Sequence, residues 1–299
     1  MLVSVIVPTY NRASLILRAV HSVLNQTYSD LECIVVDDCS TDNTKQVIES
    51  IDDNRLVYLR HDVNKHASAA RNTGIRQANG QLIAFLDSDD EWLPEKLAKQ
   101  VQLIQSLPEK IGMVYCWMDY YDENFKVIKE HHPTLKGRVF SYLLDKQALG
   151  ACSTLLVRPE VVKAVGGFDE SLPRGNDGDF IRRVCLEYEV DFIPEMLVKY
   201  HIGHSGKRIS DTDQQGIKNA IHSQLTKLEK FRNYIPVYPK QFSNVYRSIS
   251  MHYSQIGEVG KSVSFLLKST RLRPFSLRLY KEILIILLNN IRVGLLKGK

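Results

Sequence analysis

Two short acidic clusters in this sequence have the residue types of a ligand site. Asp87-Ser88-Asp89 directly follows the apolar run 81–86, and Asp37-Asp38 directly follows the apolar run 31–36. Two carboxylates one residue apart at a strand end can hold a hard divalent cation such as Mg²⁺ or Mn²⁺, which prefers oxygen ligands and often keeps substrate phosphates in its shell. The structural alternative for Asp87-Ser88-Asp89 is an acidic start to the helix that follows.

The acidic pair Asp37-Asp38 and the aromatic Tyr10 have side chains that can bind a nucleotide. A carboxylate at a strand end can accept a hydrogen bond from the N–H of a base or from a ribose hydroxyl. A tyrosine that follows the first strand could stack on a base. Helix capping is the alternative for the second cluster, although Ser40 and Asp42 suit a cap better than the acidic pair does. Packing is the alternative for Tyr10.

The elements that must position these side chains alternate between strand and helix. β-branched and other apolar runs predict strands at 2–7, 31–36, 55–59 and 81–86. Helical spacing and capping residues predict helices at 13–24, from Ser40-Thr41-Asp42 to about residue 51, and at 66–78 and 94–107. This alternation predicts an α/β fold with an open, mostly parallel sheet flanked by helices.

Polar clusters follow each of the four predicted strands. They are Pro8–Asn11, Asp37–Asp42, His61–His66 and Asp87–Asp90. Ligands of open parallel sheets bind just beyond the carboxyl ends of the strands. The clusters are therefore expected to share one edge of the sheet and one ligand.

The second half of the chain is less regular. Apolar runs predict strands at 111–118, 149–157 and 190–193, and helices are expected from Pro159, over 180–188, over 213–233 and within 241–296. Residues 216–299 hold 15 Lys and Arg against 3 Asp and Glu, whereas residues 1–215 hold 24 against 31. An acidic front thus carries a basic tail, which could meet nucleic acid, an anionic membrane surface or an acidic partner, or could be a solvated helical surface.

Composition excludes several classes of protein. Of the 299 residues, 44% are hydrophobic and 24% charged, so a globular core is expected and wholesale disorder is excluded. Five scattered cysteines without a CxxC pair argue against a disulfide scaffold or a zinc cluster, and favour a reducing compartment, the cytoplasm. The N-terminus does not resemble a signal peptide, and no window of about 18 apolar residues predicts a transmembrane helix.

Four ordered motifs resemble the glycosyltransferase family 2 domain, which has the GT-A fold. They are SVIVPTYNR at 4–12, VVDDCSTDNT at 35–44, NKHASAARNTGI at 64–75 and GQLIAFLDSDDEW at 80–92, and the likeness extends over about 2–205. The resemblance implies a nucleotide-diphosphate sugar donor, usually a UDP-sugar, a divalent metal (Mn or Mg) and inversion at the anomeric carbon. It implies a catalytic domain at 1–212, with a nucleotide-binding half at 1–107 and an acceptor half at 108–212, and a basic helical extension at 213–299.

The resemblance also implies roles for single residues. Asp38 would contact uracil, Arg71 would reach the base or the phosphates, and Asp89 would be the main protein ligand of the metal. Asp87 would bind ribose or the metal. The implied nucleotide-binding set is Pro8, Tyr10, Asn11, Asp37, Asp38, Arg71, Asp87 and Ser88.

A second signature of the family lies further along the chain. A GGFDE turn at 166–170 precedes Asn176-Asp177-Gly178-Asp179, where the family usually has Glu-Asp-x-Asp. Asp177 maps to the general base, and Asn176 and Asp179 are expected on the acceptor side. The loop Tyr200–Ser210 resembles the one that closes the nucleotide site, with His204 preferred to His201 as a metal ligand and Lys207 and Arg208 near the diphosphate.

Two segments of the basic tail have a recognisable sequence pattern. Residues 246–274 resemble one degenerate tetratricopeptide-type helix pair, and the apolar stretch 279–296 has basic flanks. That stretch could lie in a membrane interface or dock on its neighbours. We expect contact with the inner face of the membrane as one option, and no nucleic-acid partner.

The expected function is inverting transfer of a sugar from a nucleotide-diphosphate donor to a hydroxyl of a glycan or lipid-linked acceptor, in surface polysaccharide or glycoconjugate synthesis. One alternative is a sugar-phosphate nucleotidyltransferase, which would want a Gly-rich basic loop where this chain has Pro-Thr-Tyr-Asn at 8–11. The other is a non-catalytic nucleotide-sugar-binding protein, against which the acidic residues Asp38, Asp89 and Asp177 argue.

Overall fold

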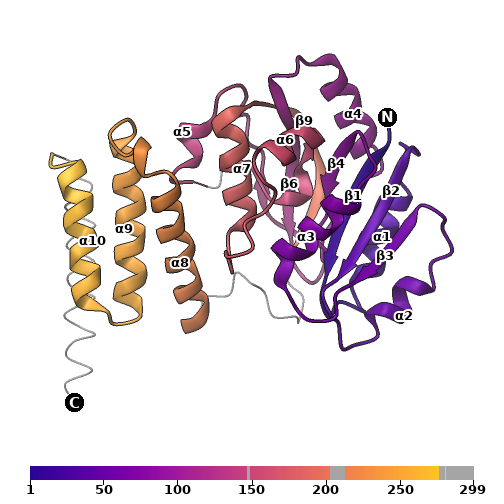
Figure 1. The fold of residues 1–299 in the computed structure, drawn as a ribbon, viewed down its shortest axis with the longest axis horizontal. Helices are drawn as coiled ribbons and strands as arrows, with labels where there is room; N and C mark the ends of the chain where they lie inside the picture. The colour runs from indigo at the N-terminus through magenta and orange to yellow at the C-terminus, as the bar shows by residue number, and fades with distance from the viewer. Residues whose placement is uncertain (147–148, 203–212, 276–279, 281–299) are drawn as a thin grey trace. The chain divides into compact units, whose positions relative to one another are not determined.

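The computed structural model of the chain describes residues 1–146, 149–202, 213–275 and 280. The chain divides into two compact units (Figure 1). The first comprises Met1–Phe140, Gln147–Ser171 and Asn176–Gly206. The second comprises Ser141–Lys146, Leu172–Gly175 and Lys207–Lys299.

One sheet forms the centre of the first unit, with the strand order β3-β2-β1-β4-β8-β6-β9-β5 and with β7 paired to β6. Its strands are β1 (Val3–Thr9), β2 (Leu31–Asp37), β3 (Leu56–Arg60), β4 (Leu82–Phe85), β5 (Glu91–Trp92), β6 (Ile111–Tyr121), β7 (Val127–His131), β8 (Leu156–Val157) and β9 (Glu189–His201).

The first four strands are parallel, as the alternation of strand and helix predicts. β1 pairs with β2 from Val3↔Leu31 to Thr9↔Asp37, and with β4 on its other side. Beyond β4 the sheet is mixed, because the short β8 runs antiparallel to both β4 and β6, whereas β6 and β9 are parallel. The open sheet, with parallel strands β1 to β4, confirms the predicted fold class.

Helices flank this sheet (Figure 1). They are α1 (Ile16–Leu24), α2 (Thr44–Glu49), α3 (His66–Gln77), α4 (Lys96–Ser106), α6 (Pro159–Ala164) and α7 (Asn176–Glu187), whereas the short α5 (Phe140–Leu143) belongs mostly to the second unit. α7 begins at Asn176 rather than at the predicted residue 180, because acidic residues in a first turn are favourable next to the helix dipole. The predicted strand 149–157 is instead a 3₁₀ turn, Cys152–Thr154, followed by the two-residue β8.

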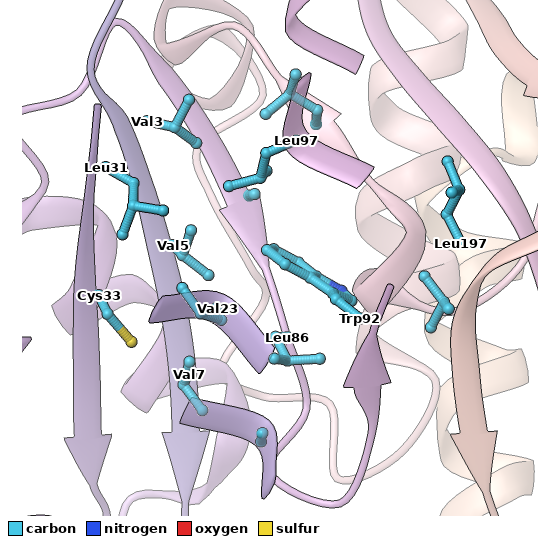
Figure 2. Close-up of a cluster of buried hydrophobic side chains, with 14 of the residues drawn as sticks. Val3, Val5, Val7, Val23, Leu31, Cys33, Leu86, Trp92, Leu97 and Leu197 are labelled. Atoms are coloured by element: carbon cyan, nitrogen blue, oxygen red, sulfur yellow. The ribbon is translucent and has the colours of Figure 1, made fainter. Parts of the chain in front are cut away.

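A buried apolar cluster lies between one face of the sheet and helices α1 and α4. Alternate residues of β1 (Val3, Val5 and Val7) and of β2 (Leu31 and Cys33) contribute to it. Figure 2 shows these side chains with Leu86, Trp92 and Leu97. All seven residues of β1 are buried, as expected for a central strand covered on both faces.

The second unit is helical, with α8 (Gln214–Lys230), α9 (Pro239–Gln255) and α10 (Val259–Leu272). Two serine pairs join α9 to α10: the hydroxyls of Ser243 and Ser269 lie 3.0 Å apart, and those of Ser250 and Ser262 lie 3.1 Å apart. In both pairs each hydroxyl also donates to the backbone carbonyl of its partner. The two helices therefore form an antiparallel pair at the place where the tetratricopeptide-type pair is predicted.

α9 begins at Pro239, seven residues before the predicted pair, and proline is well tolerated in the first turn of a helix. No helix among the described residues is long and apolar enough to cross a membrane. The apolar stretch 279–296 lies outside the described residues, apart from Tyr280.

Candidate active site

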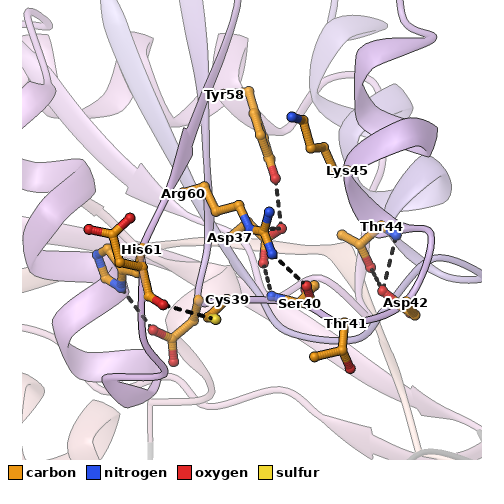
Figure 3. A network of polar contacts seen from close by, with 12 residues as sticks. Asp37, Cys39, Ser40, Thr41, Asp42, Thr44, Lys45, Tyr58, Arg60 and His61 are labelled. Carbon is orange, nitrogen blue, oxygen red and sulfur yellow. Dashed lines mark hydrogen bonds and ion pairs between the residues drawn. The ribbon is translucent and has the colours of Figure 1, made fainter.

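Asp37, at the end of β2, is fully buried and supports a turn. Its Oδ1 accepts a hydrogen bond from the N–H of Ser40 at 2.8 Å, and its Oδ2 accepts one from the hydroxyl of Tyr58 at 2.7 Å. Nε of Arg60 lies 3.9 Å from Oδ2 (Figure 3). Burial and the hydrogen bond to Asp37 raise the pKa of Tyr58 above its usual value. The contacts of Asp37 are thus those of a structural brace.

Asp38 has different surroundings, although it is the next residue. Its Oδ1 lies 2.8 Å from Nδ1 of His61 and accepts the N–H of Lys65 at 2.8 Å. Both neighbours come from the segment after β3. The two neighbouring carboxylates therefore differ in their contacts. Asp37 stabilises the turn after β2, whereas Asp38 is held by residues of the cluster that follows β3.

The first strand end supplies Pro8, Tyr10 and Asn11. Pro8 is buried and paired opposite Val36, whereas Tyr10 is 44% exposed and so does not pack in the core. Asn11 has a left-handed backbone with φ of 51°, and its Oδ1 accepts the N–H of Thr41 at 2.8 Å. Asn11 thereby ties the loop after β1 to the loop after β2.

The loop Asp87–Asp90 follows β4 and is held by two distant side chains, Ser153 and Arg18. Ser153 accepts the N–H of Asp87 at 3.1 Å and donates to Oδ2 of Asp90 at 2.6 Å. Arg18 of α1 donates to the carbonyl of Asp89 at 2.5 Å. The indole of Trp92 donates to the carbonyl of Ser153 at 2.8 Å. Asp89 and Asp87 are half-buried, and Ser88 is buried.

The carboxylates of this loop repel one another. Burial raises the pKa of Asp90 well above its usual range, and the charges of Asp89 and Asp87 raise it further. Burial also raises the pKa of Asp87, and Arg71 opposes that rise. A hard divalent cation would neutralise this concentrated negative charge with the oxygen ligands that it prefers, so the donor set fits such an ion.

Arg71 joins the Asp87 loop to the start of α7. It is buried in α3, its Nη2 donates to Oδ1 of Asp87 at 2.5 Å, and its Nη1 donates to Oδ1 of Asn176 at 3.4 Å. Its guanidinium lies over the Phe168 ring, 5.3 Å from the centroid. Burial acts to lower the pKa of Arg71, but Asp87 and other nearby acidic groups, including Asp177, together outweigh this effect and the pKa is raised. Arg71 is therefore engaged by protein carboxylate and amide oxygens.

The first turn of α7 carries the predicted acceptor-side residues. Asp177 is half-buried, and its charge acts on both Arg71 and Asp87, so it lies near the Asp87 loop. Its Oδ1 accepts the N–H of Gly178 at 2.7 Å. Asp179 is buried and its Oδ2 accepts from Nε of Arg183 at 2.9 Å. Asp177 is thus grouped with the Asp87 loop, whereas Asp179 is committed to an ion pair within its own helix.

Of the two histidines that the sequence offers as metal ligands, His204 lies outside the described residues. His201, at the end of β9, is buried, and its N–H lies 3.3 Å from Oδ1 of Asp90. Burial and the charge of Arg18 lower the pKa of His201 to about 4. Among the described residues, no group of three or more His, Cys, Asp or Glu side chains is arranged to hold a metal ion.

Sequence patterns missed three residues of this site. Ser153 and Arg18 support the Asp87–Asp90 loop from 63 and 71 residues away in the chain. No local spacing points to such partners. His61 lies within a predicted strand-end cluster, but its contact with Asp38 follows only from the tertiary structure.

Solved structures share this fold. Over 91% of both chains, S. aureus TarS in complex with UDP-GlcNAc superposes with a TM-score of 0.62 at 17% sequence identity. The mannosyltransferase PcManGT of Pyrobaculum calidifontis, solved with GDP-Man and Mn²⁺, superposes with a TM-score of 0.60 at 18% identity, over 95% of this chain and 78% of that one. Both are GT-A glycosyltransferase structures, and at this identity the likeness shows the fold.

Curated relatives share the sequence. An uncharacterised glycosyltransferase of Methanocaldococcus jannaschii is 31% identical over 72% of this chain and 75% of its own length. The Escherichia coli UDP-Glc:alpha-D-GlcNAc-diphosphoundecaprenol beta-1,3-glucosyltransferase WfaP is 36% identical over 55% of this chain. This match spans 63% of the length of WfaP.

The family model described as glycosyl transferase family 2 matches residues 4–163. That stretch contains β1 to β4 with their strand-end clusters, the Asp87–Asp90 loop and Ser153. The model thus spans more than half of the chain, and it agrees with the relatives in sequence and with the solved structures in fold. The protein belongs to glycosyl transferase family 2 and is a glycosyltransferase.

Proposed function

We propose that the protein transfers a sugar, with inversion, from a nucleotide-diphosphate donor to a hydroxyl of a glycan or lipid-linked acceptor. The donor is a UDP-sugar, and the product belongs to surface polysaccharide or glycoconjugate synthesis. The relatives support this proposal, since WfaP is named as a transferase that uses UDP-Glc and a diphosphoundecaprenol-linked acceptor. TarS was solved with UDP-GlcNAc, and PcManGT was solved with GDP-Man.

One observation carries the proposal: Arg71 brings the start of α7 to the acidic loop after β4. Its guanidinium contacts Asp87 at 2.5 Å and Asn176 at 3.4 Å, and Asp177 is the residue after Asn176. Asp177, a carboxylate that can accept a proton, thereby begins a helix held close to the carboxylates that would bind a metal. General-base transfer from an acceptor hydroxyl needs this pairing of sites.

In the proposed reaction Asp177 is the general base. The acceptor hydroxyl oxygen attacks the anomeric carbon and forms the new C–O bond, while the bond between that carbon and the diphosphate oxygen breaks. The hydroxyl proton passes to the Asp177 carboxylate, and the electron pair leaves on the nucleotide diphosphate. A single displacement inverts the anomeric centre, so no second nucleophilic carboxylate is required.

Asp89 and Asp87 would hold the divalent metal, because they are half-buried carboxylates on one short loop. His204, which the sequence also offers, lies outside the described residues. A bound cation of this kind neutralises the charge that develops on the departing diphosphate. The contribution of the chain itself is to keep the two carboxylates in place through Ser153 and Arg18.

The nucleobase is assigned to Asp38 and Tyr10. Tyr10 is exposed and has a ring face on which a base can stack. Asp37 and Asn11 support the loops that carry Asp38 and Tyr10, since both are used in internal hydrogen bonds. Arg71, assigned to the base or the phosphates, also orders the site by its contacts to Asp87 and Asn176.

We also propose that the protein acts in the cytoplasm, in part at the inner face of the membrane. All five cysteines are free, which supports a reducing compartment. The basic composition of residues 216–299 supports contact with anionic lipid.

Asp177→Asn tests the proposed reaction, because the amide keeps the shape of the side chain but cannot take a proton. We expect UDP-sugar transfer to fall by about 10²–10⁴-fold, the usual contribution of a general base. Donor affinity should change little, since Asp38 and Asp89 are assigned to the donor. The matched control is Glu187→Gln, at the exposed far end of the same helix. Loss of affinity with an unchanged rate at saturating donor would make Asp177 a binding residue and refute the assignment.

A further inference from the structure

Hydrogen bonds engage every polar atom of Asp38 except one. Its N–H donates to the carbonyl of Thr9 at 2.8 Å, and its own carbonyl accepts from Nδ2 of Asn64 at 3.3 Å. Its Oδ1 accepts from Nδ1 of His61 and from the N–H of Lys65, both at 2.8 Å. No described residue donates to Oδ2. The Asp38 carboxylate is thus fixed through Oδ1, and Oδ2 is available to accept a hydrogen bond from a ligand.

His61 is held from its other side as well. Its N–H donates to the carbonyl of Asp37 at 2.8 Å, which fixes the residue at the end of β3. Its Nε2 lies 2.9 Å from Oγ1 of Thr73 in α3, and Nη2 of Arg76 donates to the same Oγ1 at 2.8 Å. The side chains of His61 and Asp38 are 8% and 4% exposed, so little water competes with their contact.

The direction of these hydrogen bonds follows from the chemistry of the groups. An ionised carboxylate only accepts, so Nδ1 of His61 carries the hydrogen that Asp38 receives. A guanidinium only donates, so the Thr73 oxygen accepts from Arg76 and its hydroxyl hydrogen is available to Nε2. A neutral His61 protonated on Nδ1 therefore satisfies all four groups. Each hydrogen bond in such a chain polarises the next and strengthens it.

We propose that His61 is a positioning residue that determines nucleobase selectivity. This rests on the proposed function, in which Asp38 reads the base. Because His61 and the Lys65 N–H hold Oδ1, Oδ2 is the oxygen left to accept a hydrogen bond from the ligand. Uracil carries an N–H at ring position 3, whereas cytosine has an acceptor nitrogen there. A carboxylate fixed in this way favours uracil, and one that is free to rotate discriminates less.

Two substitutions of His61 separate this role from simple packing. The amide nitrogen of His61→Asn can take the place of Nδ1 and still donate to Asp38, whereas that of His61→Gln reaches the Nε2 position and cannot. We expect His61→Gln to weaken UDP binding, and to reduce the preference for UDP over CDP, each by about tenfold, as is typical when a residue that orients a ligand group is lost. His61→Asn should keep both values within about threefold, the margin set by retaining one hydrogen bond of the two.

Titration calorimetry with UDP and CDP measures both values, with His21→Asn on the exposed face of α1 as the control. The proposal is overturned if both variants bind UDP as the native protein does. It is also overturned if both lose affinity for UDP and CDP equally, because that outcome indicates packing alone.

A double-mutant cycle distinguishes this inference from the proposed function. In the Asp38→Asn background, His61→Gln should cause no further loss of UDP affinity, and an additive loss would overturn the positioning role. If Asp38→Asn alone leaves UDP affinity unchanged, the assignment of the base to Asp38 fails. If Asp38→Asn weakens UDP binding and His61→Gln does not, only the role of His61 fails.

Discussion

Lys96 is a fully buried lysine at the start of α4, and its titration should be visible in the stability of the protein. Its Nζ donates to Oε1 of Gln100 at 2.7 Å and lies 3.7 Å from the centroid of the Trp92 ring. No described carboxylate forms an ion pair with it. Burial lowers the pKa of Lys96 to about 8 from its usual value of 10.5.

The size of the effect follows from this shift. Each pKa unit corresponds to about 1.36 kcal/mol, so burying the ammonium group costs about 3 kcal/mol at neutral pH. The Trp92 ring stabilises the charged form by up to about 2 kcal/mol when desolvated. The net cost is therefore about 1–3 kcal/mol.

The direction in which stability changes with pH follows from the lowered pKa of the lysine in the folded chain. Below pH 8 the lysine is protonated in both the folded and the unfolded chain, and the folded chain bears the full cost. As the pH rises from 8 towards 10.5, the folded lysine loses its proton first, so the unfolded chain binds more protons and stability increases. Buried thiols act in the opposite direction, because burial raises the pKa of Cys33 and Cys116 to about 12. Only a comparison with a Lys96 variant isolates the lysine.

The assay is urea unfolding of the native protein and Lys96→Met between pH 7 and 10 under reducing conditions, followed by tryptophan fluorescence. Both tryptophans, Trp92 and Trp117, lie in the first unit. We expect the native free energy of unfolding to rise relative to that of the variant by about 1–3 kcal/mol over this range. The hydrogen bond that Gln100 loses does not depend on pH and so cancels. Parallel curves for the two proteins would refute the reasoning, and Lys45→Met on the surface is the control.

Three further predictions concern the ligands. Asp89→Ala should abolish metal-stimulated donor turnover without changing the circular dichroism spectrum, because carboxylate oxygens are the ligands of a hard cation; full turnover would contradict the assignment. UDP should raise the melting temperature more than ADP or GDP, since a ligand stabilises the state that binds it; equal shifts would argue against uracil recognition. Binding to anionic liposomes should fall steeply with salt and disappear when residues 276–299 are deleted, and binding that survives both changes would exclude an electrostatic tail.

The first four strands could be predicted because each is a short apolar run that ends at a polar cluster. Val3–Thr9 and Leu31–Asp37 agree with the predicted runs to within two residues. Helix starts were less accurate. α1 begins at Ile16 rather than at residue 13, and no side chain caps it. Capping residues set a helix boundary only where their side chains reach the first turn. Near the start of α1, the Asp42 carboxylate accepts hydrogen bonds from the N–H groups of Ala13 and Thr44.

The site was harder to predict than the fold, because its contacts join distant parts of the chain. Arg71 is predicted at the nucleotide site, but its contacts with Asp87 and with Asn176, which lies 105 residues away, follow only from the tertiary structure. The run 149–157 is apolar enough for a strand, yet the structure uses Ser153 in a turn that holds Asp90. The local sequence pattern shows which residues are polar, whereas the tertiary structure determines which residues they contact.

The serine pairs of α9 and α10 have a consequence for how this hairpin finds its register. Ser243 and Ser250 are seven residues apart, as are Ser262 and Ser269. A slip of seven residues between the two helices would align Ser243 with Ser262 and leave the other two serines without partners. Because a buried hydroxyl without a partner is unfavourable by about 1–3 kcal/mol, such misalignment is disfavoured by polar groups, independently of side-chain volume. The buried serine hydroxyls therefore help to fix the register between α9 and α10.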